Sequence, residues 1–440
     1  MMGIIRRPSR RQILKTTATL AAAGVLPARH AGALGNEPPP SRAAAFPHID
    51  ASLRAATAAQ EVPGVVAIAA TEHGILYEGV FGSRRQSGGP AKEAAMTRDT
   101  VFRIASMVKL ITSVAALRLV EQGKLSLDAP VPEIDPAVGA PQVLDGFDAR
   151  GIPQLRPPKR PISLRHLLTH TSGFTYRLWD AEAIRYVNAI DKAPPAQRSK
   201  LPRTPLMFDP GERWQYGPSI DWVGRIVEAV GGEPLETQFR KHIFEPLGMK
   251  DTAFEITPAQ RVREASAHQR QPDASLKPEP MEPAPKPHAA PRHHSGGGGI
   301  YSTAPDYLTL LRTLMHDGAF EGARILRPET VALMGQNQIG GIEAGILKTT
   351  TPRLSNNVDF FHGISLKWGF GHMINMQPVP EARSAGSMTW AGLFNTYYWI
   401  DPKKHVAAVF MTQVLPFADE RALRVYRQFE RGVYAAVKTG

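Results

Sequence analysis

The chain carries, at residues 102–122, the stretch FRIASMVKLITSVAALRLVEQ. Its apolar residues recur at helical spacing, and Gly123 follows as a stop signal, so we expect a long buried helix. Ser106 and Lys109 lie near the start of this helix, where backbone N–H groups point outward. Positions i and i+3 share one helix face, so Lys109 can reach the Ser106 hydroxyl. Because a serine becomes a nucleophile when an adjacent base accepts its proton, the pair is a candidate catalytic centre.

Short apolar runs on both sides of this helix indicate strands. Residues 65–70 and 75–81 flank Glu72-His73-Gly74 and predict a β-hairpin. Further strands are expected late in the chain, at 366–372, 385–390, 396–400 and 406–412. Further helices are expected at 162–168, 220–230, 304–315 and 422–437, and the Pro- and Gly-rich residues 134–162 are expected to form a loop.

The early hairpin and the late strands can form one antiparallel sheet if the middle of the chain is an insertion. We therefore predict an α/β region, with an antiparallel sheet flanked by helices, from residues 48–112 and 296–440. Residues 113–295 are predicted to form a second, mainly helical region with Pro-rich loops. Clefts favour such junctions, so the active site is expected between the two regions.

Composition excludes several classes of function. The chain has 440 residues, of which 42% are hydrophobic and 21% charged, as in ordinary globular proteins. It has no cysteine, which rules out disulfides and cysteine-ligated metals. Six basic and no acidic residues within 1–33 account for half of the net charge of +12. Because no basic stripe with interleaved aromatic residues occurs elsewhere, nucleic acid is not an expected partner.

The N-terminus has the three parts of an export signal. Ser9-Arg10-Arg11-Gln12-Ile13-Leu14-Lys15 resembles a twin-arginine pattern, residues 16–26 are apolar, and Ala31-Gly32-Ala33 offers a cleavage site. The alternative is a basic, disordered tail. We expect a signal peptide at 1–33, a linker at 34–47, and a periplasmic or secreted mature protein. The apolar run is too short to span a bilayer, so no stable membrane insertion is expected.

Several motifs occur in the order that is typical of one superfamily. They are FRIASMVK (102–109), LLTHTSG (167–173), YGPS (216–219), FEPLGM (244–249) and GGIYST (298–303). Together they resemble the serine β-lactamase and penicillin-binding-protein superfamily, most of all class C β-lactamases and family VIII carboxylesterases. The resemblance spans residues 46–435 and implies a β-lactamase/transpeptidase-like fold.

The resemblance also implies roles for individual residues. Ser106 is the acylated nucleophile, Lys109 its base, and Tyr216 shares the proton transfer. The backbone N–H groups of Ser106 and Leu393 form the oxyanion hole, which stabilises negative charge on the attacked carbonyl. Trp390 and Gly392 belong to the substrate cleft.

The third motif of the lactamases is where this chain departs from them. Its single Lys-Thr-Gly is Lys438-Thr439-Gly440, beyond the final predicted helix, and we interpret it as coincidence. At the matching position stands Thr389-Trp390-Ala391-Gly392, which resembles the Trp-Gly-Gly motif of family VIII esterases. Trp390 replaces a cationic anchor with an apolar wall, which favours neutral esters over carboxylate-bearing lactams.

Other signals indicate no further site. The chain has no Gly-x-Ser-x-Gly, so an α/β-hydrolase elbow is unsupported. His288, His293 and His294 stand in a Pro-rich stretch and are expected to be solvated rather than metal ligands. Residues 296–299 lack the spacing of a phosphate loop. His170 is expected to be a buried, hydrogen-bonding residue, and Tyr176 is a candidate for the wall of the cleft.

These observations predict an exported serine hydrolase that cleaves short-chain carboxylic esters through an acyl-enzyme, without a cofactor or a metal. A β-lactamase or D,D-peptidase is the first alternative, and the missing Lys-Thr-Gly counts against it. The second is a non-catalytic, penicillin-binding-like binding module, against which the intact Ser106, Lys109 and Tyr216 argue.

Overall fold

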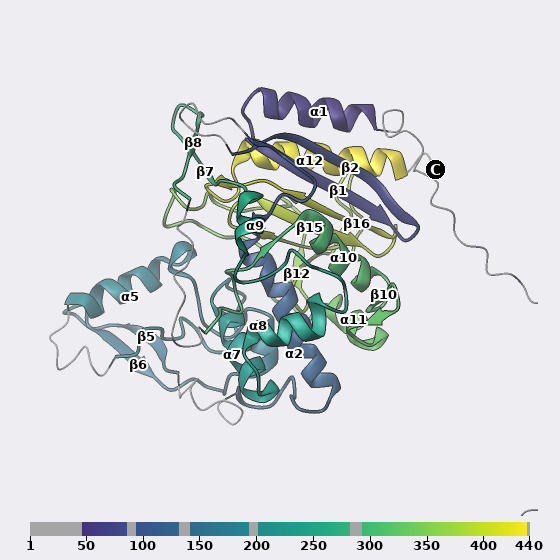
Figure 1. Ribbon diagram of the computed structural model, residues 1–440. Helices are drawn as coiled ribbons and strands as arrows, with labels where there is room; N and C mark the ends of the chain where they lie inside the picture. Colours follow the sequence, from purple (N-terminus) through teal and green to yellow (C-terminus); the bar gives the residue numbers. More distant parts are fainter. Residues whose placement is uncertain (1–45, 86–93, 132–140, 193–200, 282–292, 438–440) are drawn as a thin grey trace, which may run out of the picture. The chain divides into compact units, whose positions relative to one another are not determined.

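An antiparallel sheet joins strands from early and late parts of the chain (Figure 1). The computed structural model describes residues 46–85, 94–131, 141–192, 201–281 and 293–437. In spatial order the strands are β12 (Leu366–Trp368), β13 (Met373–Asn375), β14 (Met388–Gly392), β15 (Thr396–Asp401), β16 (Val406–Met411), β1 (Gly64–Thr71), β2 (Gly74–Arg85) and β3 (Ala94–Ala95). Because β1 pairs with both β2 and β16, the predicted sheet from both chain ends is confirmed.

Successive side chains along each strand point to opposite faces of this sheet, and helices cover both faces. The covering helices are α1 (Pro47–Ala58), α10 (Ala304–Met315) and α12 (Glu420–Val437). On β15, Tyr397 stacks on Tyr426 of α12 with ring centroids 4.5 Å apart. Its neighbour Tyr398 faces the other way and lies 5.4 Å from Tyr307 of α10. Helix α1 lies beside α12 (Figure 1), and residues 64–70 of β1 and all of β16 are buried.

The chain between the two halves of the sheet folds mainly into helices. These elements are the 3-10 turn η2 (Ala105–Met107), α2 (Val108–Glu121), α4 (Leu164–Leu168), the 3-10 turn η4 (Arg177–Trp179), α5 (Ala181–Lys192), α7 (Ser219–Gly231), α8 (Leu235–Phe239), the π-helix η5 (Arg240–Phe244) and α9 (Pro258–Val262). Helix α11 (Pro328–Met334) follows α10. Residues 108–117 of α2 are all buried, and α7 and α8 pack against it. A helix that is buried all round is a core element, as its apolar pattern predicted.

Small sheets accompany the main one. They pair β4 (Phe102–Arg103) with β9 (Tyr301–Ser302), β5 (Val143–Phe147) with β6 (Pro153–Arg156), β10 (Ala319–Phe320) with β11 (Ala323–Arg324), and β7 (His268–Arg270) with both β8 (Leu276–Pro278) and β17 (Val414–Leu415). The pairs β4–β9 and β7–β17 join segments far apart in the chain.

Two expectations about local structure were wrong. The α-helix predicted from Phe102 begins only at Val108, because residues 102–103 pair with β9, nearly 200 residues later in the chain. The predicted loop at 134–162 contains the β5–β6 hairpin, whose turn is closed by the Asp148 side chain accepting from the backbone N–H groups of Arg150 and Ile152. Composition favoured a loop there, but side-chain hydrogen bonds and pairing across the turn stabilise strands.

Some predicted segments lie outside the described residues. They are the signal peptide at 1–33, most of the linker at 34–47, and the Lys438-Thr439-Gly440 tripeptide. Residues 42–440 group as one compact unit, and the boundaries of the two predicted regions within it stay a prediction. Among the helices of the described ranges, none combines the length and the apolar character that a bilayer crossing needs.

Candidate active site

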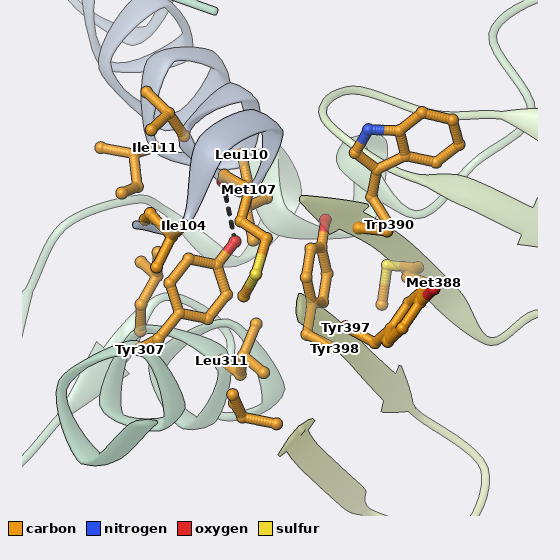
Figure 2. Close-up of a cluster of buried hydrophobic side chains, with 14 of the residues drawn as sticks. Ile104, Met107, Leu110, Ile111, Tyr307, Leu311, Met388, Trp390, Tyr397 and Tyr398 are labelled. Atoms are coloured by element: carbon orange, nitrogen blue, oxygen red, sulfur yellow. Dashed lines mark hydrogen bonds between the residues drawn. The ribbon is translucent and has the colours of Figure 1, made fainter. Parts of the chain in front are cut away.

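The turn that carries Ser106 is held in an unusual conformation. Ser106 lies in η2, directly before α2, and the preceding Ala105 has a left-handed φ of +43°. A side chain in that region costs about 1–3 kcal/mol, which the surrounding packing must offset. Figure 2 shows part of that packing, where the Tyr307 hydroxyl donates to the Met107 carbonyl at 2.9 Å. Helix α10, which carries Tyr307, therefore helps to fix the serine turn.

Gly392 lets strand β14 approach the same turn. A Cβ built at this position would stand 2.3 Å from the Ile104 carbonyl oxygen and 2.3 Å from Thr396 Oγ1. No side chain fits there, so the glycine is required for the close approach of two backbones. As a consequence, the next residue, Leu393, lines the same cavity as Ser106.

Lys109 brings its amine to Ser106 from the first turn of α2. Its Nζ lies 3.2 Å from Ser106 Oγ and donates to the Gly297 carbonyl at 2.7 Å. The lysine is only 1% exposed. Two hydrogen bonds thus hold the amine beside the serine and away from bulk water.

The glycine run at 296–299 reaches Lys109 because it packs backbone-to-backbone on α7. A Cβ at Gly296 would stand 2.4 Å from the Ile220 carbonyl oxygen and 2.9 Å from the Cα of Gly224. The Gly296 carbonyl also accepts from Thr112 Oγ1 at 2.6 Å. The run is therefore a structural part of the site, although it is not a phosphate loop.

Tyr216 lies on another side of Lys109. The centroid of its ring is 5.0 Å from Lys109 Nζ, and the residue is 2% exposed. Its hydroxyl oxygen accepts a hydrogen bond of 3.1 Å from Trp390 Nε1. The structure thus brings Ser106, Lys109 and Tyr216 together although the tyrosine lies far along the chain.

Aromatic rings enclose Tyr216. Their centroids lie between 4.7 and 6.5 Å from that of Tyr216, and they belong to His170, Trp390, Trp179, Tyr176, Trp214 and Trp368. Rings at these distances exclude water and strengthen the remaining electrostatic interactions.

His170 is a buried titratable neighbour of Tyr216. The residue is 1% exposed, and the centroid of its imidazole ring lies 4.7 Å from that of the Tyr216 ring. Neither imidazole nitrogen has a hydrogen-bond partner among the described residues. Burial, together with the charge of Lys109, holds the pKa of His170 well below its ordinary value, so the ring is neutral. The predicted burial is confirmed, and the hydrogen bonds of His170 among the described residues come from its backbone, whose N–H donates to the Leu167 carbonyl and whose carbonyl accepts from the Gln215 N–H.

Tyr176 connects the site to α7. Its hydroxyl donates to Asp221 Oδ2 at 3.2 Å, and Ser295 Oγ donates to the other oxygen of that carboxylate. The Gly297 N–H in turn donates to Ser295 Oγ at 3.1 Å. Burial and the Asp221 carboxylate raise the pKa of Tyr176 well above its ordinary value, so it stays protonated. This chain of bonds anchors the carbonyl that Lys109 uses.

A cavity of about 510 Å³ opens at Ser106, a size typical of small-molecule sites. Its walls are mainly apolar and come from Tyr176, Leu178, Trp179, Ile184, Val187, Leu354 and Leu393. Arg177, Asn188 and Thr351 add polar groups. Tyr176, which was predicted to line the cleft, is therefore part of the cavity wall. Trp390, which was also predicted for the cleft, is 3% exposed and packs against Tyr216.

Sequence reasoning missed the residues that orient or surround the predicted centre. Gly297 precedes the motif at 298–303 by one residue, and the four consecutive glycines were the available signal of a close backbone approach. The walls from η4 and α5, such as Leu178 and Ile184, carry no motif. Only the fold places those side chains opposite Ser106.

The remaining histidines of the Pro-rich stretch form no metal cluster in the described residues. The side chain of His293 is 93% exposed, and His294 stacks on Phe254 with ring centroids 4.2 Å apart. His288 lies outside the described residues.

The chain is similar to a known protein family, to characterised relatives and to solved structures. Residues 49–432 match the family described as Beta-lactamase. The ML-236A carboxylate methylbutanoyltransferase of Penicillium citrinum is 31% identical over 412 residues, covering 89% of this chain and 94% of that protein. The lovastatin esterase of Penicillium rubens is 30% identical over 401 residues, covering 88% and 98%. A mutant simvastatin synthase from Aspergillus terreus superposes with a TM-score of 0.76 at 29% identity, covering 89% and 99%.

Proposed function

This chain belongs to the β-lactamase family, and we propose that it cleaves small carboxylic esters through a covalent acyl-enzyme on Ser106. One observation carries the proposal: Ser106 Oγ lies 3.2 Å from the buried Lys109 amine and faces a mainly apolar cavity. Tyr216 lies beside the same amine, which completes a nucleophile with a two-residue base.

The geometry supports a two-step reaction. Ser106 Oγ attacks the ester carbonyl carbon, and its proton passes to the Lys109–Tyr216 pair. The tetrahedral intermediate then breaks its bond to the alkoxy oxygen, which leaves as an alcohol with that proton. A water molecule repeats the attack on the acyl-serine and releases a carboxylic acid and the free serine.

We assign the oxyanion hole to the backbone N–H groups of Ser106 and Leu393. Ser106 stands in the first turn of η2, whose leading N–H groups have no partner within the helix. Leu393 lies beside it because Gly392 brings the two backbones together. Two such donors stabilise the negative charge that develops on the carbonyl oxygen.

The cavity favours a neutral substrate. Its leucine, isoleucine, valine and tryptophan side chains offer apolar surface to an acyl or alkyl group. At β14, Trp390-Ala391-Gly392 stands where a lactamase has Lys-Thr-Gly, so a cationic partner for a lactam carboxylate is missing from that strand. Esters are therefore preferred over lactams.

A second candidate is acyl transfer to an alcohol acceptor. It is favoured by the similarity to a methylbutanoyltransferase, while the similarity to an esterase favours water as the acceptor. Both reactions share the acyl-serine and differ only in the nucleophile of the second step.

A Ser106→Ala variant tests the proposal. We expect the protein to hydrolyse p-nitrophenyl butyrate far faster than a chromogenic cephalosporin, and the variant to lose at least about 10³-fold in activity. Mass spectrometry should show the butyryl mass on Ser106. Ser52→Ala, a matched change on α1, should retain activity.

The other outcomes identify the alternatives. Fast cephalosporin turnover with little ester cleavage would show a lactamase, and no turnover by folded protein would show a binding module. Faster release of p-nitrophenol with an added alcohol, together with formation of a new ester, would show acyl transfer.

A further inference from the structure

We propose that the indole N–H of Trp390 is a positioning group that sets the proton affinity of Tyr216. The inference rests on the proposed acyl-enzyme function for its kinetic consequence, but the hydrogen bond behind it stands on geometry alone. Trp390 thus acts through the tyrosine, in addition to forming part of the apolar surroundings of the site.

The direction of the hydrogen bond is fixed by chemistry. Trp390 Nε1 lies 3.1 Å from the Tyr216 hydroxyl oxygen, and an indole nitrogen can only donate. The phenol oxygen is therefore the acceptor, and its own proton must point elsewhere. This leaves the phenol proton free for exchange on the side away from the indole.

The indole is held rigidly in this position. Trp390 is 3% exposed and pairs with Tyr398 in the β14–β15 ladder. Trp368 packs edge-on against it with ring centroids 4.7 Å apart, and Phe360 packs similarly at 6.1 Å. A buried, packed donor loses little entropy when it forms a bond, so the N–H is a permanent feature of the environment of Tyr216.

The other titratable groups that face Tyr216 come from four segments. They are Lys109 of α2, His170 after α4, Tyr176 before η4 (with Asp221 beyond it), and Tyr398 of β15. Burial keeps His170 neutral, and it raises the pKa values of Tyr176 and Tyr398 well above the ordinary value, so both stay protonated. Lys109 is thus the group that exchanges charge with Tyr216, and Trp390 is a fixed dipole beside the pair.

A fixed donor stabilises the phenolate more than the phenol. Hydrogen bonds to a charged acceptor are about twice as strong as those to a neutral one, and the surrounding rings keep out water that would compete. Loss of the N–H should therefore make Tyr216 hold its proton more tightly. In the proposed reaction, the acid limb of the pH–rate profile would then move to higher pH.

Two substitutions at position 390 remove the N–H in different ways. Trp390→Phe removes the indole, and replacement of Trp390 by 3-benzothienylalanine keeps the shape while sulfur takes the place of the N–H. Trp214→Phe is the matched control, because the Trp214 ring also lies against Tyr216, at 6.4 Å, while its N–H has no hydrogen-bond partner among the described residues.

The first readout needs no activity. Ultraviolet difference titration against the corresponding Tyr216→Phe protein isolates phenolate formation at Tyr216. We expect its midpoint to move about one pH unit higher in both position-390 proteins, as for the loss of one hydrogen bond to a charged group, and to stay in place in Trp214→Phe.

The second readout is the pH dependence of kcat/KM for p-nitrophenyl butyrate. The acid limb of this profile should move to higher pH by the same amount in the two position-390 proteins, and should not move in Trp214→Phe. Unmoved titrations in the benzothienylalanine protein, or an equal shift in Trp214→Phe, would overturn the inference. A shifted titration without Ser106-dependent turnover would instead support the role of the N–H and reject the proposed function.

Discussion

Lys109 is oriented by neutral partners. Its amine bonds to the Ser106 hydroxyl and to the Gly297 carbonyl, and neither of these partners among the described residues is a carboxylate. A carboxylate partner would favour the charged amine, whereas a carbonyl orients it without adding a negative charge. The Gly297 carbonyl therefore orients the amine that serves as base in the proposed reaction.

The glycine run gives a prediction at the residue scale. Gly296→Ala would place a Cβ against the Ile220 carbonyl and force the run away from α7. Overpacking of this kind costs about 1–3 kcal/mol of stability, and moving the adjacent Gly297 carbonyl by about 1 Å should cost roughly 100-fold in kcat. Steady-state kinetics on p-nitrophenyl butyrate with the folded variant measure this loss.

The same run supplies the control. A Cβ at Gly298 meets nothing within 4 Å, and the backbone there is not left-handed. Gly298→Ala should therefore retain near-normal kinetics and stability. Equal losses in the two variants would mean that the run is sensitive to any side chain, and that its approach to α7 is not what orients Lys109.

At the scale of elements, η4 and α5 form the wall opposite the serine. The cavity is lined by Leu178 of η4 and by Ile184 and Val187 of α5. Another face of α5 is exposed to solvent. The amphipathic pattern of α5 predicts a helix, but it does not indicate which cavity the apolar face closes. In the proposed reaction, substrate size would therefore depend on an element that lacks a family motif.

This wall yields a second prediction. Ile184→Trp fills the cavity, so we expect the ratio of kcat/KM for p-nitrophenyl hexanoate to that for the acetate to fall about tenfold or more. Ala181→Trp, on the exposed part of the same helix, should leave the ratio unchanged. An unchanged ratio in Ile184→Trp would show that the acyl chain enters elsewhere.

At the scale of the whole molecule, a buried ion pair joins the late strands to the last helix. Arg383 Nε donates to Glu430 Oε1 at 2.6 Å, and its Nη2 donates to the Tyr426 hydroxyl at 2.6 Å. The side chains of Arg383 and Glu430 are 0% and 3% exposed. Such a pair fixes the position of α12 on the sheet rather than adding much net stability.

Breaking this pair should be costly. Glu430→Gln leaves the Arg383 charge buried, so we expect the free energy of unfolding to fall by about 3–5 kcal/mol in urea denaturation. Glu381→Gln is the matched control, because Glu381 faces Arg431 at the surface, and it should change the free energy by less than about 1 kcal/mol. Equal, small effects would show that water reaches Arg383.

We also propose that the mature protein is periplasmic or secreted. The proposal is supported by the basic, apolar and small-residue segments of 1–33 in the sequence. It is independent of the fold and of the site.

Much of the fold followed from local patterns. Short apolar runs located β1, β2, β15 and β16, and apolar residues at helical spacing located α2, α7, α10 and α12, because burial of these elements is recorded directly in the local sequence. The boundaries that failed, at Phe102 and at the β5–β6 hairpin, depend on pairing partners or turn bonds that no periodicity records. Ser106 and Lys109 were predictable together because one helical turn sets their distance.

The sequence by itself determined the candidate pair Ser106 and Lys109, the tyrosine motif and most strands of the main sheet, since each is encoded by neighbours along the chain. Only the tertiary structure decided what surrounds the pair. The Gly297 carbonyl reaches Lys109, the Trp390 N–H reaches Tyr216, and α5 closes the cavity through contacts between residues far apart in sequence. Such contacts depend on packing in three dimensions, so no local spacing can specify them.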